Sequence, residues 1–262
     1  MESALKNKLA IVGGSSDGMG RATAEAFAAE GANVAMFART EKKLLAAADE
    51  IRSRFGVQVL AQAVDVTQVE TIEKFIAAVA STFGRLDVCV ANAGGPPPKN
   101  FLSISMDEWR KAVDLNFLSV VALARGVIPH MQRNHWGRFV TITSTSVRQP
   151  IADLILSSAV RPAVVGLVKS LAIEFGKDGI TVNNVAPGYT ATERLKELAS
   201  VRALAAGISE QEIYEKWAAD IPIRRLAKPE EIADTIVWLS SERAASITGQ
   251  TIMVDGGAYK GM

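Results

Sequence analysis

The sequence has little cysteine and almost no net charge, and both shortages exclude classes of protein. Its single cysteine, Cys89, has no partner for a disulfide, which is typical of a chain that folds in a reducing compartment. Its 29 lysines and arginines nearly balance 28 acidic residues, so no basic surplus favours nucleic acid or an acidic membrane surface. No segment is predicted to be a signal peptide or a membrane span. We therefore expect a cytoplasmic protein.

Histidine is also scarce, and this argues against two kinds of site. His130 ends an amphipathic helical stretch and His135 lies in a polar turn, so both are expected at the surface or in packing rather than in acid–base catalysis. No cluster of residues has the spacing of metal ligands. The sequence therefore predicts no metal site.

What the 262 residues do contain is a regular alternation of β-rich and helical stretches. Strands are predicted at 9–12, 33–37, 57–64, 86–91, 138–143, 180–186 and 250–254, with helices that include 21–30, 41–55, 69–83 and 229–239. This alternation predicts an α/β fold, a Rossmann-type doubly wound parallel sheet of about seven strands with helices on both faces. About six of the strands are apolar almost throughout, as expected of strands buried on both sides.

No linker or repeat divides the chain, so residues 1–262 are predicted to form a single dinucleotide-binding domain. Residues 189–222 interrupt its rhythm with a helical insertion of about thirty residues after the sixth strand. An insertion at the end of a strand in this architecture usually covers the ligand site. We therefore expect a helical substrate lid at 189–222.

The carboxyl ends of the predicted strands carry small and polar residues, and open parallel sheets bind ligands at that edge. The first strand runs into Gly14, Gly18 and Gly20 before a helix. Glycine lets the backbone approach a pyrophosphate, and the start of the helix offers free N–H groups and the positive end of its dipole. Glycines also simply make tight turns. The polar ends of the other strands, among them Asp65 and Asn92, favour the phosphate-binding interpretation.

Several segments together carry a resemblance to a known family. They are GGSSDGMG, ANAG, the LN pair that ends in Asn116, GRFVTITS ending in Ser144, and VNNVAPGYTAT. With them the sequence resembles the short-chain dehydrogenase/reductases, close to the 3-oxoacyl-[acyl-carrier-protein] reductase-like branch, over nearly its whole length. The resemblance implies an NAD(P)-dependent oxidoreductase that reduces a carbonyl (3-oxoacyl or small ketone) or oxidises the corresponding alcohol. It also implies a homotetramer.

The resemblance further implies which residues hold the cofactor. They are Gly14, Ser16, Gly18 and Met19 for the diphosphate and adenosine ribose, Asp65 and Val66 for the adenine, Asn92 and Gly94 for the ribose, and Pro187, Gly188, Thr190 and Thr192 for the carboxamide end. Some of these residues have plainer alternatives. Asp65 and Thr67 can cap the next helix through a box with Glu70, and Asn116 can bond to backbone inside its own helix. Gly13 stands where the family usually has threonine, a departure expected to remove one hydrogen bond from the loop.

The end of the second strand predicts the choice of cofactor. An NAD enzyme of this fold needs a carboxylate there for the ribose 2′-hydroxyl, whereas an arginine accommodates a 2′-phosphate. Arg39 supplies the cation, and Thr40 adds a donor. Asp17 opposes this interpretation, because its carboxylate would repel a phosphate if it pointed inward. NADP(H) is therefore favoured over NAD(H).

The catalytic set is altered. In the family a serine orients the carbonyl, a tyrosine transfers the proton, a lysine lowers the pKa of that tyrosine and holds the ribose, and an asparagine anchors a water relay. Ser144 and Asn116 match this set, but Ser157 and Arg161 stand where the tyrosine and lysine are expected. An aliphatic hydroxyl is a far weaker acid than a phenol, and arginine binds ribose hydroxyls without shuttling a proton. Tyr189 is the nearest phenol along the chain and is expected to pack in the wall of the site.

Three interpretations follow from this altered set. The first is a reductase or dehydrogenase with changed proton transfer at Ser157 and Arg161. The second is a non-catalytic NADP(H)-binding protein that acts as a sensor or partner subunit. The third is a different reaction in the same cleft.

Overall fold

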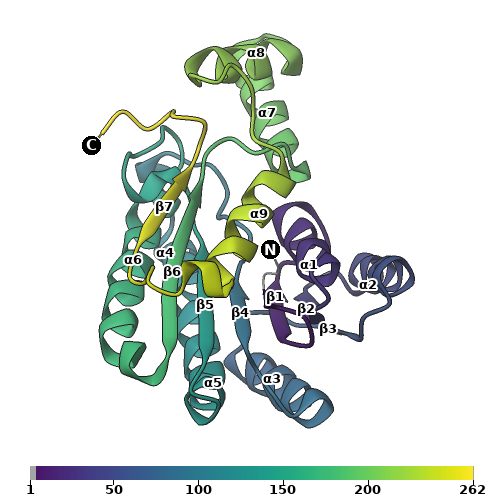
Figure 1. The fold of residues 1–262 in the computed structure, drawn as a ribbon. Coiled ribbons are helices and arrows are strands. Elements are labelled where there is room, and N and C mark those ends of the chain that lie inside the picture. Colours follow the sequence, from purple (N-terminus) through teal and green to yellow (C-terminus); the bar gives the residue numbers. More distant parts are fainter. Residues whose placement is uncertain (1–3, 262) are drawn as a thin grey trace.

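The computed structural model describes residues 4–261, which form a seven-stranded sheet in the order β3-β2-β1-β4-β5-β6-β7 (Figure 1). The strands are β1 (Leu9–Gly13), β2 (Asn33–Ala38), β3 (Val59–Ala63), β4 (Val88–Ala91), β5 (Gly137–Ile142), β6 (Ile180–Pro187) and β7 (Thr251–Val254). All neighbouring strands are parallel, and the winding reverses between β1 and β4. This is the predicted doubly wound sheet. Residues 1–3 and 262 of the predicted domain lie outside the described part.

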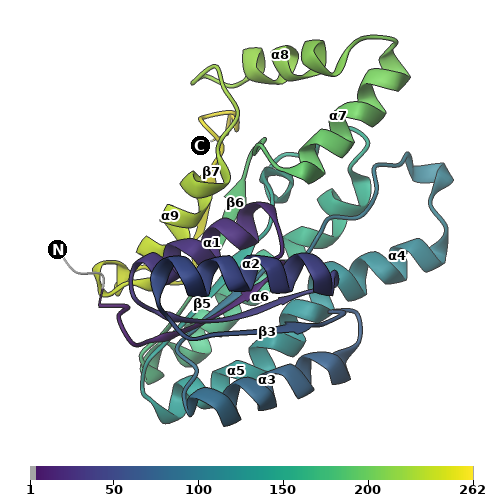
Figure 2. The same ribbon diagram turned by 90° about the vertical axis from the view of Figure 1, so that its right-hand side faces the viewer.

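Helices cover both faces of the sheet (Figure 2). One face carries α1 (Gly18–Ala29), α2 (Glu41–Phe55) and α9 (Pro229–Ser240), and the other carries α3 (Val69–Phe83), α5 (Ser119–Arg133) and α6 (Ile155–Phe175). The short helix α4 (Met106–Val113) continues through a π-helical turn, η2 (Asp114–Leu118), into α5. Each face has its own apolar core, so the sheet is buried between two layers of helices.

The strands differ in burial by their place in the sheet. The inner strands β1, β2, β4, β5 and β6 are almost fully buried, as their apolar sequences predict. The edge strands β3 and β7 are only partly buried. The expectation of about six strands buried on both sides was therefore slightly too high, because an edge strand has fewer helices over it.

Two helical stretches, Met106–Arg133 and Ile155–Asp178, are long and apolar enough to cross a membrane by length and composition alone. The expectation that no segment meets this criterion was wrong. Both stretches contribute buried residues to the core against the sheet, for example Val127 and Val164. Core helices of globular proteins commonly pass the same test, so the finding is weak support for a membrane span.

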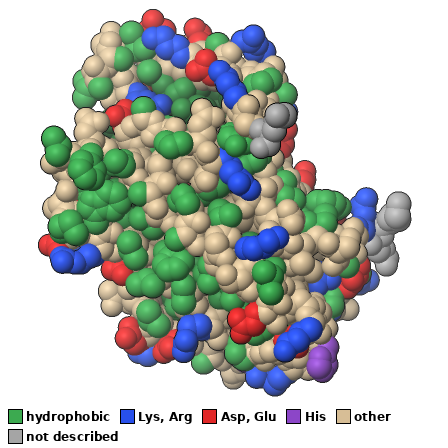
Figure 3. Space-filling view, turned by 90° about the vertical axis from the view of Figure 1, so that its left-hand side faces the viewer, with side chains coloured by type: hydrophobic (Ala, Val, Ile, Leu, Met, Phe, Trp, Pro, Cys, Tyr) green, Lys and Arg blue, Asp and Glu red, His purple; other side chains and the backbone are tan. Residues whose placement is uncertain are grey.

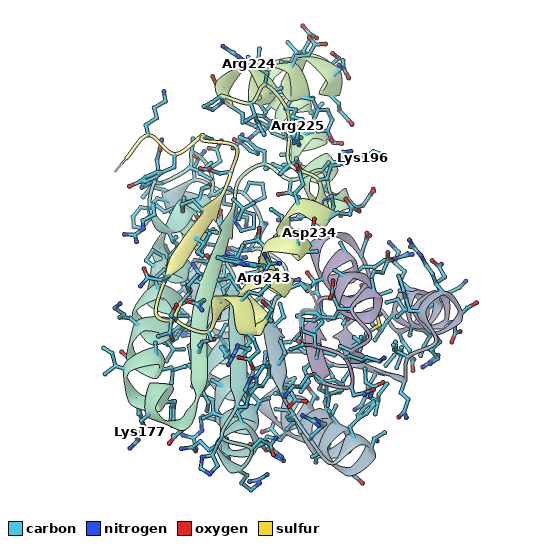
Figure 4. The ribbon with its side chains drawn as sticks, viewed as in Figure 1. Lys177, Lys196, Arg224, Arg225, Asp234 and Arg243 are labelled. Atoms are coloured by element: carbon cyan, nitrogen blue, oxygen red, sulfur yellow. The ribbon has the colours of Figure 1, made fainter. Side chains whose placement is uncertain are left out.

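The chain between β6 and α9 forms two helices, α7 (Glu193–Ala206) and α8 (Glu210–Asp220), which project beyond the sheet (Figures 1 and 2). They have a small apolar core of their own, made by Leu195, Ala199, Ala203, Ile213 and Trp217. The charged side chains Lys196, Arg224 and Arg225 lie at this end of the molecule (Figure 4). The predicted insertion is therefore a compact helical pair with its own packing.

Candidate active site

The loop between β1 and α1 is a cradle of glycines. Gly14 and Gly18 have positive φ angles of 59° and 54°, which favour glycine. A Cβ on Gly20 would lie 2.2 Å from the carbonyl oxygen of Gly14, so no side chain fits there. Asn92, which follows β4, donates from Nδ2 to the carbonyl oxygen of Gly13 at 3.1 Å. The loop is thus held close to the end of β4, with its backbone at the start of α1.

Gly13 has a packing reason that the sequence did not reveal. A Cβ at this position would lie 2.7 Å from the Phe37 ring and 2.7 Å from the carbonyl oxygen of Asn92. The Phe37 ring therefore fills the space that a threonine would need. Ser15 donates from Oγ to the carbonyl oxygen of Phe37 at 3.3 Å and ties the loop to β2. Gly13 thus makes room for the Phe37 ring, and this packing effect comes in addition to the expected loss of one hydrogen bond.

The residues at the ends of β1 and β2 fit a dinucleotide phosphate. Ser16 and Met19 are partly exposed beside the cradle, and Arg39 is exposed with no ion-pair partner in residues 4–261. Thr40 is the N-cap of α2, and its side chain makes no capping bond. The carboxylate of Asp17 disfavours an anion at the start of α1. Its Oδ1 accepts from the N–H of Gly18 at 2.6 Å, so a negative charge already lies there. Its Oδ2 lies 4.0 Å from Nζ of Lys43.

The end of β3 differs from the predicted helix cap. Oδ1 of Asp65 accepts from the N–H of Thr67 at 3.0 Å and from its hydroxyl at 2.8 Å. The helix α3 begins at Val69, and its N-cap Gln68 makes no side-chain capping bond. The alternative of a capping box from Thr67 to Glu70 is therefore wrong, because the Asp65 carboxylate engages Thr67 in a turn before the helix starts.

A small cavity of about 10 Å³ lies under the ends of β4 and β5, against η2 and α6. Its lining includes Val66, Asn92, Asn116 and Arg161, so four predicted site residues meet there. Nδ2 of Asn116 donates to the carbonyl oxygen of Gly94 at 3.0 Å rather than to backbone within its own helix. Within residues 4–261, Oδ1 of Asn116 and Nε of Arg161 are buried without a hydrogen-bond partner. These two atoms are a free acceptor and a free donor on residues that line the cavity.

Three serines are linked by hydrogen bonds next to Thr143 and Arg161, which line this cavity. Oγ of Ser144, just beyond β5, accepts from the N–H of Ser146 at 3.1 Å. Oγ of Ser146 lies 3.1 Å from Oγ of Ser157, and either hydroxyl can donate. Ser157 and Arg161 lie one turn apart on α6, and both are buried. The guanidinium of Arg161 donates from Nη1 to the carbonyl oxygen of Ile142 at 3.2 Å, and burial lowers its pKa to about 10.

The chain after β6 passes over the glycine cradle. Pro187 ends the strand, and the N–H of Gly188 donates to the carbonyl oxygen of Val254 at 3.0 Å. The hydroxyl of Thr190 donates to the carbonyl oxygen of Gly188 at 3.2 Å. Thr192 caps α7, and its Cγ2 lies 3.2 Å from where a Cβ of Gly18 would stand. The base of the helical insertion therefore contacts the loop at the start of α1.

Two arginines of α7 fasten the helical insertion to the loops around the site. Nη2 of Arg194 donates to the carbonyl oxygen of Pro96 at 3.0 Å, in the loop after β4. Arg202 donates to the carbonyl oxygen of Ala152 at 3.1 Å and to the hydroxyl of Tyr189 at 3.3 Å. The Tyr189 ring stacks on Trp217, with centroids 4.7 Å apart, and so packs in the wall. Sequence reasoning missed both arginines, because their partners lie 98 and 50 residues away along the chain.

The two histidines lie in helix-end and turn positions. Nδ1 of His130 is 2.7 Å from Nη2 of Arg133, and His135 occupies a turn with a φ angle of 48°. Within residues 4–261, no group of three or more histidine, cysteine or acidic side chains is arranged to hold a metal ion.

Comparisons with known proteins agree with this geometry. Residues 14–259 match the family model described as enoyl-(acyl carrier protein) reductase. The chain is 34% identical to 3-oxoacyl-[acyl-carrier-protein] reductase of Escherichia coli, over 97% of this chain and 98% of that protein. L-sorbose reductase from Gluconobacter frateurii, solved with NADPH and L-sorbose, is 34% identical with a TM-score of 0.96, over 100% of both chains.

A second solved structure, an actinorhodin polyketide ketoreductase variant with NADPH, is 31% identical with a TM-score of 0.93, over 97% of this chain and 98% of that one. These likenesses extend along nearly the whole chain. The chain therefore belongs to the short-chain dehydrogenase/reductase family of NAD(P)-dependent oxidoreductases.

Proposed function

We propose that the protein is an NADPH-dependent reductase of a 3-oxoacyl compound or small ketone, able to oxidise the corresponding alcohol in reverse, with altered proton transfer. The observation that carries this proposal is the meeting of Ser144, Ser157 and Arg161 beside a cavity that also contains Asn92, the residue that ties down the glycine cradle. The similar proteins from Escherichia coli and Gluconobacter frateurii are named as reductases of carbonyl compounds.

NADPH is favoured over NADH because Arg39 is exposed and free to pair with a 2′-phosphate. Thr40 offers a second donor at the start of α2. The residues that would hold the rest of the cofactor are Gly14, Ser16, Gly18, Met19, Asp65, Val66, Asn92, Gly94, Arg161, Pro187, Gly188, Thr190 and Thr192. When bound, the cofactor supplies a hydride, and the protein supplies its alignment. Both NADPH-bound structures named above support this choice.

The hydroxyl of Ser144 donates to the carbonyl oxygen of the substrate. As the new C–H bond forms at the carbonyl carbon, the electron pair of the C=O π bond moves to the oxygen, which then takes a proton. Ser157 and Ser144 are not joined by a chain of hydroxyls, because Oγ of Ser144 accepts from the backbone N–H of Ser146 while Ser157 contacts the Ser146 hydroxyl. Neither Ser144 nor Ser157 is a strong acid. The proton therefore comes from water, and Asn116 is the residue expected to hold it. Since a positioned acid–base group contributes about 10² to 10⁴ in rate, we expect slow turnover.

The helical segment 189–222 is proposed to be the substrate lid. Its attachment through Arg194 and Arg202 to the loops that follow β4 and β5 supports this role. A cytoplasmic location also remains a proposal. Cys89 is buried in β4, where burial raises the pKa of its thiol, so it is protected from reaction in any compartment.

A homotetramer is proposed from the surface around α4 and α6. Hydrophobic side chains collect on this side of the molecule (Figure 3). Exposed apolar residues include Met106 on α4, Ile173 on α6, Leu118 in η2, and Phe101 and Leu102 in the turn before α4. Such a surface suits helix packing between copies of the chain. Light scattering at micromolar concentration should give four times the mass of one chain, and the mass of a single chain would contradict the proposal.

One experiment separates the reductase from the non-catalytic alternative, which is favoured by the weakly acidic hydroxyl of Ser157. NADPH binding is measured by fluorescence titration, and oxidation of NADPH is then followed with a panel of ketones and 3-oxoacyl thioesters. Binding with slow oxidation supports the reductase. Binding without oxidation of NADPH by any carbonyl compound favours a sensor or partner subunit.

A further inference from the structure

Arg161 is a buried cation without a counter-charge. Its residue is 8% exposed, and no ion pair within residues 4–261 includes its guanidinium. Its Nη1 donates to the neutral carbonyl oxygen of Ile142 at 3.2 Å. Buried charges in proteins are normally paired, because a lone charge loses its hydration without compensation. Something that approaches Arg161 from outside the chain is therefore expected to supply the negative charge.

Two serine hydroxyls belong to the same candidate site as this guanidinium. Ser157 lies one turn earlier on α6, and its hydroxyl shares a hydrogen bond with Ser146. Ser144 accepts from the N–H of Ser146, which leaves its own hydroxyl hydrogen free. The Ser157 hydroxyl and the guanidinium match the two oxygens of a carboxylate, and the Ser144 hydroxyl is left to donate to a carbonyl oxygen.

A water molecule can accept a hydrogen bond from Nε of Arg161, but it is neutral and does not compensate the charge of the guanidinium. Nε of Arg161 and Oδ1 of Asn116 line the same cavity, and one is a free donor and the other a free acceptor. The cavity of about 10 Å³ has room for one water that bonds to both. Nη2 of Arg161 points the other way, toward Gly95, where a Cβ would stand 3.8 Å from it. Because Gly95 has no side chain, this end of the guanidinium stays open.

The ribose of the cofactor, which is the part expected beside Arg161, does not remove the charge. A ribose hydroxyl at Nη2 would satisfy a donor but is itself neutral. The exposed cations Lys196 and Arg224 of the α7–α8 end are solvated, and the exposed Arg225 pairs with Glu231 (Figure 4). Arg161 differs from them because water cannot surround it.

We infer that the substrate carries a carboxylate that pairs with Arg161 and Ser157, while Ser144 holds the carbonyl that is reduced. The substrate class is then a free oxo acid rather than a neutral ketone or a thioester. Oγ of Ser144 accepts from the N–H of Ser146, and Oγ of Ser157 lies 3.1 Å from Oγ of the same residue, so both serines lie against Ser146. A carbonyl and a carboxylate held by two serines that share one neighbour are expected to be close in the substrate, as in a 2-oxo or 3-oxo acid. The inference rests on the proposed function but is tested through binding as well as turnover.

The binding test uses hydroxy acids with the protein and NADPH, a pair that cannot react because both partners are reduced. Short, medium and long 2- and 3-hydroxy acids are each compared with their methyl esters by calorimetry. We expect at least one acid to bind about ten- to a hundredfold more tightly than its ester, since a charge-assisted hydrogen bond is lost in the ester. Equal or tighter binding of every ester would overturn the inference.

Variants then assign the preference to Arg161. Arg161→Met should bring the acid-to-ester ratio close to one, and Arg161→Lys should keep part of it. Lys177→Met is the matched control, because it removes one positive charge from an exposed residue just beyond the far end of α6 (Figure 4). It should leave the ratio unchanged. If Arg161→Met weakens NADPH itself while the ratio persists, Arg161 is a cofactor ligand alone and the inference fails.

Turnover separates this inference from the proposed function. Oxidation of NADPH by the oxo acids in preference to their esters supports both. Tight, Arg161-dependent binding of the acids with no oxidation of NADPH supports the substrate class and contradicts the reductase. Brisk oxidation by neutral ketones, with no preference for acids in binding, supports the reductase and overturns the substrate class. Melting temperatures of all variants show whether Arg161→Met is folded, and the comparison in the parent protein stands without it.

Discussion

Two arginines at the carboxyl edge of the sheet make an instructive comparison. Arg39 and Arg161 both lack an acidic partner within residues 4–261. Arg39 follows β2 and is exposed, so water solvates its charge at little cost. Arg161 is buried on α6, where the same charge has a substantial desolvation cost. An unpaired cation in solvent needs no explanation, whereas an unpaired cation in the interior indicates a missing ligand.

The largest expected effect is on the rate of NADPH oxidation and concerns Ser144, the proposed catalytic serine on the side of the buried arginine. Ser144→Ala should lower the rate of NADPH oxidation by about 10² to 10³, because the donor to the developing oxyanion is lost. The dissociation constant for NADPH should stay the same, since Ser144 is not among the proposed cofactor ligands. Steady-state kinetics and fluorescence titration check the two quantities. Ser170→Ala, at an exposed position of α6, is the control, and an unchanged rate in Ser144→Ala would contradict the proposed role.

Restoring a phenol and a lysine tests the altered proton transfer. The double change Ser157→Tyr with Arg161→Lys should raise the oxidation of NADPH by neutral ketones about ten- to a hundredfold. Each single change should do less, because a phenol without a nearby lysine keeps a high pKa. Rates with a small ketone are compared across the four proteins. A parent that turns over rapidly and is slowed by the double change would assign Ser157 and Arg161 to another mechanism.

Reversing the charge of the exposed arginine, Arg39, should raise the dissociation constant of NADPH about tenfold. Arg39→Asp should weaken NADPH binding by that factor or more and leave NADH binding nearly unchanged, because only NADPH has the 2′-phosphate. Titration of both cofactors measures the difference. Lys177→Asp makes the same change of charge far from the site. Superimposable NADPH titrations for Arg39→Asp and the parent would remove the basis for the cofactor preference.

The smallest expected effect concerns the acid beside the glycine cradle. Asp17→Asn should tighten NADPH binding about two- to fivefold, since it removes a like charge from the start of α1 while an asparagine still caps the helix. The gain should shrink at high salt, because Asp17 is exposed. Titrations at low and high ionic strength measure both effects. A loss of affinity would mean that the carboxylate orders the loop.

Much of the fold could be predicted because its signals are local. The helices at 41–55 and 69–83 begin and end where the sequence predicts, since each has a strong apolar period and a glycine at its C-cap. The strand predicted at 57–64 is shorter, Val59–Ala63, because pairing at an edge depends on the neighbouring strand. The capping box that the sequence allows at Thr67 does not form, because the Asp65 carboxylate engages Thr67. Neither the length of β3 nor the partner of Thr67 can be predicted from a few consecutive residues.

The candidate site could be predicted only where neighbours along the chain carry it. The positive φ angles at Gly14 and Gly18 fit a phosphate-binding loop and also the alternative, a plain tight turn, because both need glycine there. The contact between Ser146 and Ser157 and the burial of Arg161 depend on how α6 packs against β5, which no spacing encodes. The Phe37 ring beside Gly13 likewise belongs to a different strand. The sequence showed that an arginine occupies position 161, but it could not show that the charge of this arginine is buried without an acidic partner.

The separate apolar core of α7 and α8 has an evolutionary consequence. Because Leu195, Ile213 and Trp217 pack mainly on one another, the segment keeps its shape with few contacts to the sheet. Its main side-chain attachments, through Arg194 and Arg202, reach backbone carbonyls, which every residue type offers. Such a segment can be exchanged between paralogues as a module. Substrate range can then diverge by recombination at this one segment while the nucleotide-binding framework is inherited unchanged.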